Sequence, residues 1–290
     1  MTSANELPDV RQDALAMAER ALAEDGPTDI TSEVVGAAGV IATAVVEYRS
    51  GGVVAGSAYA DAVVQLSNCG TLRWNQVDGD VVEAGAVLAT LEGDLARLLF
   101  AERTLLNFLQ RACGIATVTR AFVDALTGTG CRVLHTRKTT PGLRVLDVHA
   151  VLSGGGGLHR LSLSSAVLVK DNHWHVLDSD GGNLRAACDA ARERGVSDIY
   201  VEVENIEQVR RACGAGATRL LIDNQESTEF RRLASVARES VPNIEIEATG
   251  GMTLETARDY AESGADFLSV GALTHSVIAA DVALEITARD

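Results

Sequence analysis

Lysine is nearly absent from this sequence. The chain of 290 residues contains 25 lysines and arginines, and only two of them, Lys138 and Lys170, are lysines. A coding bias toward arginine explains the overall shortage but not the positions where lysine is retained. Because arginine cannot replace lysine where a compact charge or a titratable amine is needed, both lysines are candidate functional residues.

Cysteines are few and lack the spacing of a disulfide framework or a thiolate metal site. The five are widely spaced, odd in number and free of any C-x-x-C pair: Cys69, Cys113, Cys131, Cys188 and Cys213. Such usage is typical of a protein from a reducing compartment, and we expect a cytoplasmic location. Whether Cys113 has a role is left open by the sequence.

Long apolar runs and excess positive charge are missing as well. No apolar run reaches the roughly 18 residues of a membrane-spanning helix, and the opening MTSANELPDVRQ lacks the basic and apolar regions of a signal peptide. With 40 acidic residues against 25 basic ones, the formal net charge is −15, whereas a surface that tracks nucleic-acid phosphates must be basic. We expect neither a membrane nor nucleic acid as a partner.

The composition favours a globular protein with a large core. Hydrophobic residues make up 47% of the chain, which is enough for one large domain or two modest ones. Residues 10–23 carry apolar side chains at helical spacing, residues 40–48 are rich in β-formers, and residues 95–112 form a long apolar stripe without glycine or proline. We expect a mixed α/β region that ends in a long helix.

Beyond residue 130 the pattern changes to short apolar runs, most of them followed by a helical segment. Such alternation predicts a parallel sheet wound with helices, either an open doubly wound sheet or a barrel. The runs are CRVLHTRK, SAVLVKDNH, DIYVEVEN, ATRLLIDN, NIEIEATGG and ADFLSVGA.

Polar residues or glycines stand where these predicted strands end. In a βα barrel the carboxyl ends of several strands meet at one mouth, where the chemistry takes place. A simpler explanation is that strands end where they meet water, but it does not account for both lysines falling at strand ends. The strand-end residues are Arg137, Lys138, Lys170, Glu204, Asp223, Thr249, Gly250, Gly251 and Gly271.

Residues 135–175 form a basic region in an acidic chain. They include five lysines and arginines against two acidic residues, together with five of the six histidines. An enclosed set of such donors stabilises a small anion such as a carboxylate or a phosphate. Gly250, Gly251 and Gly271 would expose backbone N–H groups close to helix N-termini, which suits phosphate.

Glu204 and Asp223 end consecutive predicted strands and carry hard oxygen ligands. Mg²⁺ shared with substrate phosphates needs one or two such carboxylates, so we expect Mg²⁺ as the cofactor. Pairing with neighbouring arginines is the alternative. The histidines lack the spacing of a zinc site on one helix, and no Gly-x-Ser-x-Gly elbow or P-loop motif is present.

A series of motifs runs through the chain in collinear order. They are EDGPTDITSE (24–33), LLFAERTLLNFLQRACGIAT (98–117), TRKTTPGLR (136–144), GGGGLHR (154–160), LVKDNH (168–173), VEVEN (201–205), LLIDN (220–224), EATGG (247–251) and SVGALTHS (269–276). Together they resemble the nicotinate-nucleotide pyrophosphorylase family, the carboxylating quinolinate phosphoribosyltransferases. The resemblance covers essentially the whole chain.

This resemblance implies an α/β fold in which an N-terminal α/β sandwich packs on an open, roughly six-stranded α/β barrel of the type II phosphoribosyltransferase kind. We place the sandwich at residues 1–110, completed by the C-terminal segment 272–290, and the catalytic barrel at residues 111–271. The implied assembly is a homodimer in which the neighbouring subunit helps to complete each site.

The resemblance also implies an activity, the Mg²⁺-dependent transfer of the phosphoribosyl group of phosphoribosyl pyrophosphate to quinolinate. Decarboxylation then gives nicotinate mononucleotide, pyrophosphate and CO₂ in de novo NAD synthesis. The resemblance also assigns roles by position. The acceptor would be bound by Arg137, His159, Arg160 and Lys170, and the partner subunit's site would be reached by Arg103. The phosphoribosyl donor and Mg²⁺ would be bound by Lys138, Glu204 and Asp223, and phosphate groups by Thr249, Gly250, Gly251, Gly271 and His275.

Four positions depart from the family pattern. Val148 and His149 stand where the family usually has Lys-Tyr, Leu158 replaces an asparagine, and Ser165 replaces an aspartate. Loss of a cation at Val148 weakens the case for a doubly charged acceptor. Neutral drift is one explanation, and a paralogue that uses another aromatic carboxylate, with or without decarboxylation, is the other.

Two further functions stay open from the sequence alone. Lys170 in a barrel could form a Schiff base, as in an aldolase, although the carboxylate pair and the glycine anion sites do not support this. The chain could also be a binding protein that retains the fold without catalysis.

Overall fold

Two separate sheets organise the chain, one in each of two compact units. The computed structural model describes residues 7–179 and 183–289. Among these, residues 7–120, 138–156 and 273–289 form one unit, called the antiparallel unit, and residues 121–137 and 157–272 form the other, called the parallel unit. The chain therefore passes between the units repeatedly.

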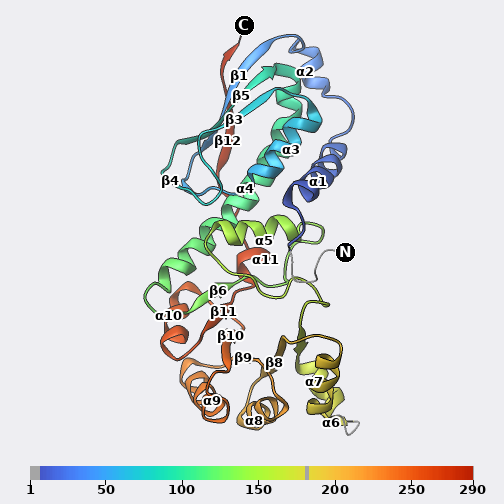
Figure 1. Ribbon diagram of the computed structural model, residues 1–290. Coiled ribbons are helices and arrows are strands. Elements are labelled where there is room, and N and C mark those ends of the chain that lie inside the picture. The colour runs from blue at the N-terminus through green and yellow to red at the C-terminus, as the bar shows by residue number, and fades with distance from the viewer. Residues whose placement is uncertain (1–6, 180–182, 290) are drawn as a thin grey trace. The chain divides into compact units, whose positions relative to one another are not determined.

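The antiparallel unit is built on a four-stranded sheet in the order β12 (Val282–Arg289), β1 (Ile41–Tyr48), β5 (Ala86–Asp94) and β3 (Thr71–Trp74). β1 pairs antiparallel with β5 on one side and with β12 on the other, so the end of the chain completes this sheet (Figure 1). Buried residues alternate along β1 with the two-residue period of a strand that packs one face on a core. A separate pair joins β2 (Gly52–Val53) and β4 (Val81–Val82).

Aspartates begin two helices of this unit. Asp9 accepts a hydrogen bond from the backbone N–H of Arg11, and Asp29 accepts from Thr31 and Ser32, which satisfies N–H groups that lack a partner in the first turn. The helices that lie wholly or mostly in this unit are α1 (Val10–Glu24), α2 (Ile30–Val34), α3 (Ser57–Ser67), α4 (Leu95–Ala125), α5 (Arg144–Ser153) and α11 (Ala272–His275).

The long helix predicted over residues 95–112 is confirmed and is longer than predicted. α4 has 31 residues and continues through Gly114, although glycine lowers helix propensity. A Cβ atom added at Gly114 would lie 2.3 Å from the carbonyl oxygen of Ile278. Glycine is therefore retained inside the helix because the segment that leads to β12 passes close to it.

The parallel unit is built on a six-stranded sheet in the order β6 (Arg132–Leu134), β11 (Phe267–Ser269), β10 (Glu245–Thr249), β9 (Arg219–Asp223), β8 (Ile199–Val203) and β7 (Val167–Val169). All neighbouring strands are parallel, and β6 and β7 are the edges, so the sheet is open. The predicted α/β fold with an open six-stranded barrel sheet is confirmed.

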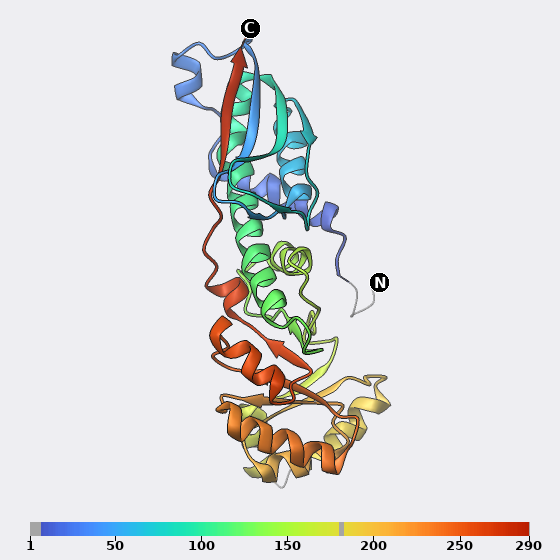
Figure 2. The ribbon, with the colours of Figure 1, turned by 90° about the vertical axis from the view of Figure 1, so that its left-hand side faces the viewer.

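Helices follow the strands of this sheet, as the alternating pattern predicts. They are α6 (Asp171–Ser179), α7 (Leu184–Glu193), α8 (Ile206–Ala215), α9 (Ser227–Ser240) and α10 (Leu254–Glu262). Two views show α8 and α9 on one face of the sheet (Figure 1, Figure 2). Glu245, which pairs in register with Arg219, and Glu247, two residues further along β10, share one face of the sheet.

The glycine-rich segment 154–157 brings the chain close to other backbone. Gly157 forms a bridge with Leu134 beside β6, and an added Cβ there would lie 2.8 Å from Leu134 Cδ2. At Gly154 an added Cβ would lie 2.5 Å from the carbonyl oxygen of Ala116 in α4. The run of glycines thus allows the segment that carries His159 to start at the edge of the sheet.

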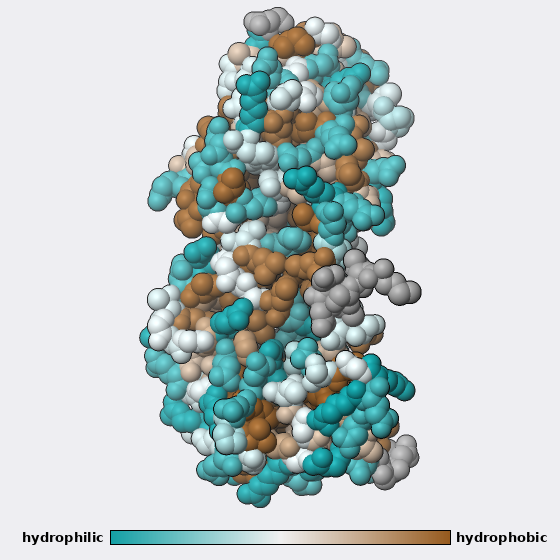
Figure 3. Space-filling model, viewed as in Figure 1, coloured by the Kyte–Doolittle hydropathy of each residue, from teal (hydrophilic) through white to brown (hydrophobic). Residues whose placement is uncertain are grey.

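Hydrophilic and hydrophobic side chains are interspersed on the face drawn in Figure 3, as on most globular surfaces. No helix among the described residues is both long and apolar enough to cross a membrane. All five cysteines are free and buried, and burial raises the pKa of the Cys113 thiol to about 12.

Arg111 and Asp147 tie together several segments of the antiparallel unit. The Nε and Nη2 atoms of Arg111 each donate to the Asp147 carboxylate at 2.8 Å, and Nη2 also donates to the Thr274 carbonyl at 3.0 Å. The Asp147 carboxylate also accepts from the backbone N–H of Thr140 at 3.1 Å and is fully buried. This pair joins α4, α5, the loop before α5 and α11.

Removal of this carboxylate should destabilise the protein strongly. Asp147→Ala should lower the free energy of unfolding by about 3–5 kcal/mol, because a largely buried guanidinium is left without its counter-ion. Asp189→Ala is the matched control: Asp189 pairs with Arg192 at the surface with its side chain 54% exposed, and its removal should cost less than about 1 kcal/mol. Urea unfolding followed by circular dichroism measures both, and equal losses would contradict this role for Asp147.

Candidate active site

Lys170 and Glu202 form an ion pair at the ends of neighbouring strands. Lys170 follows β7, and its Nζ lies 2.5 Å from Oε2 of Glu202 in β8. Burial raises the pKa of Glu202, the contact with Lys170 lowers it, and the charges of Asp223 and Asp171 raise it, so that the net shift is upward. This end of the sheet therefore gathers carboxylates around one lysine.

Glu202 is a functional candidate that the sequence prediction missed. The prediction names Glu204 because it follows the apolar run, yet in the structure Glu204 is exposed and its backbone N–H donates to Oε1 of Gln208 at 2.8 Å. Glu202 is the carboxylate that contacts Lys170. Because side chains two residues apart lie on the same face of a strand, the alternation in VEVEN is a signal that could have identified Glu202.

Asp223 is the last residue of β9 and lies level with the end of the neighbouring strand β8. Val203 of β8 pairs with Ile222 of β9, so Glu204 and Asp223 are the next residues along these two strands. Oδ2 of Asp223 accepts a hydrogen bond from Nδ2 of Asn224 at 2.6 Å. The structure thus brings the two predicted metal-binding residues to the same edge of the sheet.

The donor set at this edge suits a hard cation that a ligand helps to hold. No group of three or more histidine, cysteine, aspartate or glutamate side chains in the described part of the chain is close enough to hold a metal alone. Mg²⁺ commonly takes one or two protein carboxylates and completes its shell with water and substrate phosphates. The carboxylates of Asp223 and its neighbours on β8 fit that requirement.

Gly250 makes room for the side chains at the end of β9. It follows β10 with a φ of 85°, and the backbone N–H of Asn224 donates to the Thr249 carbonyl at 3.1 Å. An added Cβ at Gly250 would lie 2.2 Å from Oδ1 of Asn224 and 2.8 Å from Oδ1 of Asp223. Gly251 has a φ of 58° with nothing within 4 Å of an added Cβ. Glycine at position 250 is therefore required by both conformation and space.

Arg137 and Arg160 place two guanidinium groups near each other in the parallel unit. Burial lowers the pKa of Arg160, and the charge of Arg137 lowers it further. Among the described residues, the Nε atom of Arg137 is buried without a hydrogen-bond partner, while Nη1 of Arg160 donates to the Ala166 carbonyl at 3.4 Å. Buried polar groups are normally satisfied, so a pair of like charges with an unsatisfied donor indicates a site for an anion.

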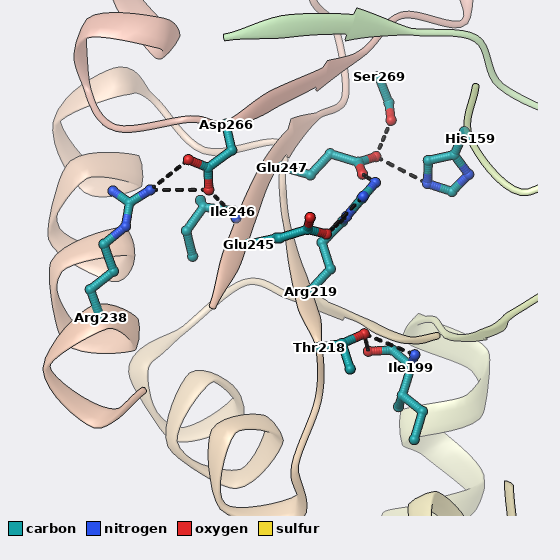
Figure 4. Close-up of polar contacts among 10 residues, drawn as sticks. All are labelled: His159, Ile199, Thr218, Arg219, Arg238, Glu245, Ile246, Glu247, Asp266 and Ser269. Carbon is teal, nitrogen blue, oxygen red and sulfur yellow. Dashed lines mark hydrogen bonds and ion pairs between the residues drawn. The ribbon is translucent and has the colours of Figure 1, made fainter. Parts of the chain in front are cut away.

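His159 lies beside a buried polar network on the sheet. Its Nε2 is 3.3 Å from Oε1 of Glu247 in β10, outside the angles of a hydrogen bond, and its ring centroid is 5.5 Å from that of Tyr200. Glu247 also contacts Arg219 and Ser269 (Figure 4). This network, which links β9, β10 and β11 to His159, was not predicted from the sequence.

The remaining predicted residues divide between the units. In the parallel unit, Thr249 ends β10 and Gly271 follows β11. Lys138, Arg103 and His275 belong to the antiparallel unit, where all three are exposed. The Lys138 carbonyl accepts from Thr274 Oγ1 at 2.9 Å, and Arg103 lines a cavity of about 400 Å³ between α1 and α4.

Three of the four departures from the family pattern lie in different environments. Val148 is fully buried in α5, so its side chain does not line an accessible surface. Burial lowers the pKa of His149, while the charges of Asp78 and Asp13 act in the opposite direction. Leu158, by contrast, is 42% exposed beside His159. Of these three, Leu158 is the one that a ligand near His159 could contact.

Ser165, the fourth departure, is engaged within its own loop. Its Oγ donates to the Ser162 carbonyl at 3.0 Å and accepts from the backbone N–H of Ser162 at 3.1 Å. The hydroxyl therefore performs a structural task in the segment before β7.

Family models and curated proteins are similar to nearly the whole chain. A model described as quinolinate phosphoribosyl transferase, C-terminal domain, matches residues 115–285, and its N-terminal counterpart matches residues 29–113. The nicotinate-nucleotide pyrophosphorylase (carboxylating) of Mycobacterium leprae is 39% identical over 275 residues, 92% of this chain and 95% of that protein. The human protein of the same name is 35% identical over 246 residues, 83% of this chain and 81% of that protein.

Solved structures agree with this similarity. A nicotinate-nucleotide pyrophosphorylase from Francisella tularensis superimposes with a TM-score of 0.89 at 32% identity and covers 99% of this chain and 100% of that one. The corresponding protein of Ehrlichia chaffeensis gives a TM-score of 0.86 at 29% identity over 97% of this chain and 100% of that one.

Substitution of Gly250 should disturb the end of β9 more than substitution of its neighbour. Gly250→Ala adds a Cβ against Asp223 and Asn224 at a positive φ and should cost about 2–4 kcal/mol. Gly251→Ala, the matched control, meets only backbone strain and should cost about 1 kcal/mol. Urea unfolding measures both losses, and a crystal structure of Gly250→Ala should show the two side chains displaced. An unchanged Asp223 position would contradict this account.

Proposed function

The chain belongs to the quinolinate phosphoribosyltransferase family, and we propose that it transfers the phosphoribosyl group of phosphoribosyl pyrophosphate to the nitrogen of quinolinate. Loss of the 2-carboxylate as CO₂ then gives nicotinate mononucleotide and pyrophosphate, a step of de novo NAD synthesis. Membership confirms the predicted resemblance. Relatives that align with nearly all of the chain are named for the carboxylating pyrophosphorylase activity.

The observation that carries the proposal is the pair Arg137 and Arg160. Quinolinate has two adjacent carboxylates, and guanidinium groups bind carboxylates through parallel hydrogen bonds. Arg137 Nε is a buried donor without a partner, and Arg160 is close enough for the two charges to affect each other. An anionic acceptor would relieve both conditions. His159 and Lys170 would supply the remaining positive charge around it.

The phosphoribosyl donor would lie along the strand ends. Asp223 with Glu204 or Glu202 would hold Mg²⁺, which when bound neutralises the pyrophosphate as it leaves. Lys138 would bind the same leaving group. Thr249, Gly250, Gly251, Gly271 and His275 would bind phosphate groups through backbone N–H groups and side chains, in keeping with the positive φ values at the two adjacent glycines.

The reaction places particular demands on these residues. As pyrophosphate leaves, C1 of the ribose gains oxocarbenium character, so the site has to orient the pyridine nitrogen in line with C1. A carboxylate clamp at Arg137 and Arg160 would provide that orientation. No general base is required for the transfer, because the pyridine nitrogen has no proton to lose. Loss of CO₂ would leave an electron pair at C2, which the pyridinium and nearby cations stabilise until a proton from water forms the C2–H bond of the product.

A homodimer and a cytoplasmic location complete the proposal. Arg103 is exposed on α4 and would enter the site of the partner subunit. The cysteines, all free and buried, are compatible with a reducing compartment.

The alternative functions differ in how well they fit the contacts. A Schiff-base lysine needs a free amine to attack a carbonyl, whereas Nζ of Lys170 donates to the Glu202 carboxylate at 2.5 Å. Transfer to a different aromatic carboxylate is the second candidate, and it is favoured by the exposed Leu158 beside His159.

A product assay tests the proposed reaction and the identity of the acceptor. With phosphoribosyl pyrophosphate, Mg²⁺ and quinolinate, the protein should release CO₂ and pyrophosphate in equal amounts, and chelation of Mg²⁺ should abolish both. Release of pyrophosphate without CO₂ on another aromatic acid would identify a paralogue. Binding of phosphoribosyl pyrophosphate in calorimetry without turnover on any acid would identify a non-catalytic protein.

Arg137→Lys tests the carboxylate clamp. Lysine keeps the charge but lacks Nε and the planar fork, so KM for the acceptor should rise about 10-fold to 100-fold while KM for the donor changes little. Arg232→Lys is the matched control, since Arg232 lies on the surface of α9 with its side chain 60% exposed. Steady-state kinetics with each substrate varied in turn measures the effect. A KM for the acceptor that matches the control would contradict the clamp.

A further inference from the structure

Glu247 is a buried carboxylate in the middle of the parallel sheet. It lies in β10 and has no exposed surface. Ser269 Oγ donates to its Oε1, Arg219 Nη1 donates to its Oε2 at 2.9 Å, and His159 Nε2 lies 3.3 Å from Oε1 (Figure 4). Three groups from different segments thus converge on one carboxylate.

The charges in this cluster balance only if His159 takes part. Arg219 is shared, because it also pairs with Glu245 at 2.8 Å. It is held in place by the rings of Tyr200 and Phe267, which lie 4.7 and 4.1 Å from its Cζ. One guanidinium therefore faces two carboxylates, and His159 is the other group that can contribute positive charge to Glu247.

Glu247 is ionised in this setting. Burial alone would raise its pKa, but the contacts with His159, Arg219 and Ser269 together lower it. An ionised carboxylate only accepts hydrogen bonds. A lone pair on Nε2 of His159 would face the negatively charged Oε1 at 3.3 Å and be repelled, whereas a proton on Nε2 turns this contact into an attractive one.

We propose that Glu247 is a positioning residue for acceptor binding: its carboxylate attracts a proton on Nε2 of His159 and keeps that nitrogen turned toward the sheet, so that the imidazolium offers its Nδ1–H as a donor to an acceptor carboxylate. This inference rests on the proposed function, in which His159 binds an acceptor carboxylate. Glu247 itself does not touch the acceptor. Arg219 and Ser269 act one step further away, by holding Glu247.

Glu247→Gln and Glu245→Gln form a matched pair for the test. Each substitution removes the charge of a carboxylate in β10 that pairs with Arg219 of β9. Glu245 differs from Glu247 in that its side chain is 45% exposed. A glutamine at position 247 can donate as well as accept, so it no longer requires a proton on Nε2. Glu247→Gln should raise KM for quinolinate at least about tenfold and leave KM for phosphoribosyl pyrophosphate within about twofold, whereas Glu245→Gln should change neither by more than about twofold.

A double-mutant cycle tests whether Glu247 acts through His159. If it does, the variant with both His159→Asn and Glu247→Gln should have the same KM for quinolinate as His159→Asn alone. Effects that multiply in the double variant would overturn the proposal, as would equal kinetics for Glu247→Gln and Glu245→Gln. Urea unfolding of each variant shows whether it folds.

Nitrogen-15 NMR of the histidine rings tests the proton directly and needs no activity. The chain has six histidines, and His159→Asn identifies the signals of His159 by their disappearance. In the wild type Nε2 should be protonated, and Glu247→Gln should shift the population toward the form protonated on Nδ1 alone. A wild-type Nε2 without a proton would overturn the proposal even if Glu247→Gln fails to fold. If quinolinate is not turned over while Nε2 is protonated, the proposed function fails and the positioning of His159 stands.

Discussion

The buried carboxylate of Glu247 is the constraint on which the parallel unit depends. A carboxylate removed from water is costly unless charged or hydrogen-bonding groups surround it. Here the compensating groups come from β9, from β11 and from the segment after the glycine run, through Arg219, Ser269 and His159. The same contacts fix these segments relative to one another, so the strand ends that carry Asp223 and Thr249 are held in register.

The positively charged side chains of the parallel unit differ in whether a carboxylate of the protein already pairs with them. Arg219 is engaged by Glu245 and Glu247, whereas Lys170 pairs with Glu202 but keeps its side chain 44% exposed. Arg137 keeps a buried Nε without a partner. A buried guanidinium Nε that no described protein group satisfies is available to an anionic ligand. It gives a physical reason why a small anion would bind here, independent of the family to which the chain belongs.

Much of the parallel sheet could be predicted from the sequence, because each strand is a short apolar run and each run ends at a polar residue. What could not be predicted depends on contacts between distant segments. Arg219 reads as the start of a strand, and only the pairing of β9 with β10 shows that it meets Glu247. Glu202 was hidden because a strand-end rule selects Glu204, while the register of β7 with β8, in which Val169 pairs with Val201, places Lys170 level with Glu202. Likewise, Gly114 reads as the end of a helix until the passage of Ile278 is known.

The central claim is that Arg137 and Arg160 form the clamp for the acceptor carboxylates. A crystal structure of the protein with quinolinate tests it most directly. The account predicts a carboxylate oxygen within about 3 Å of Arg137 Nε, with a second contact to Arg160. Quinolinate bound elsewhere, with Arg137 Nε still lacking a partner, would contradict the claim.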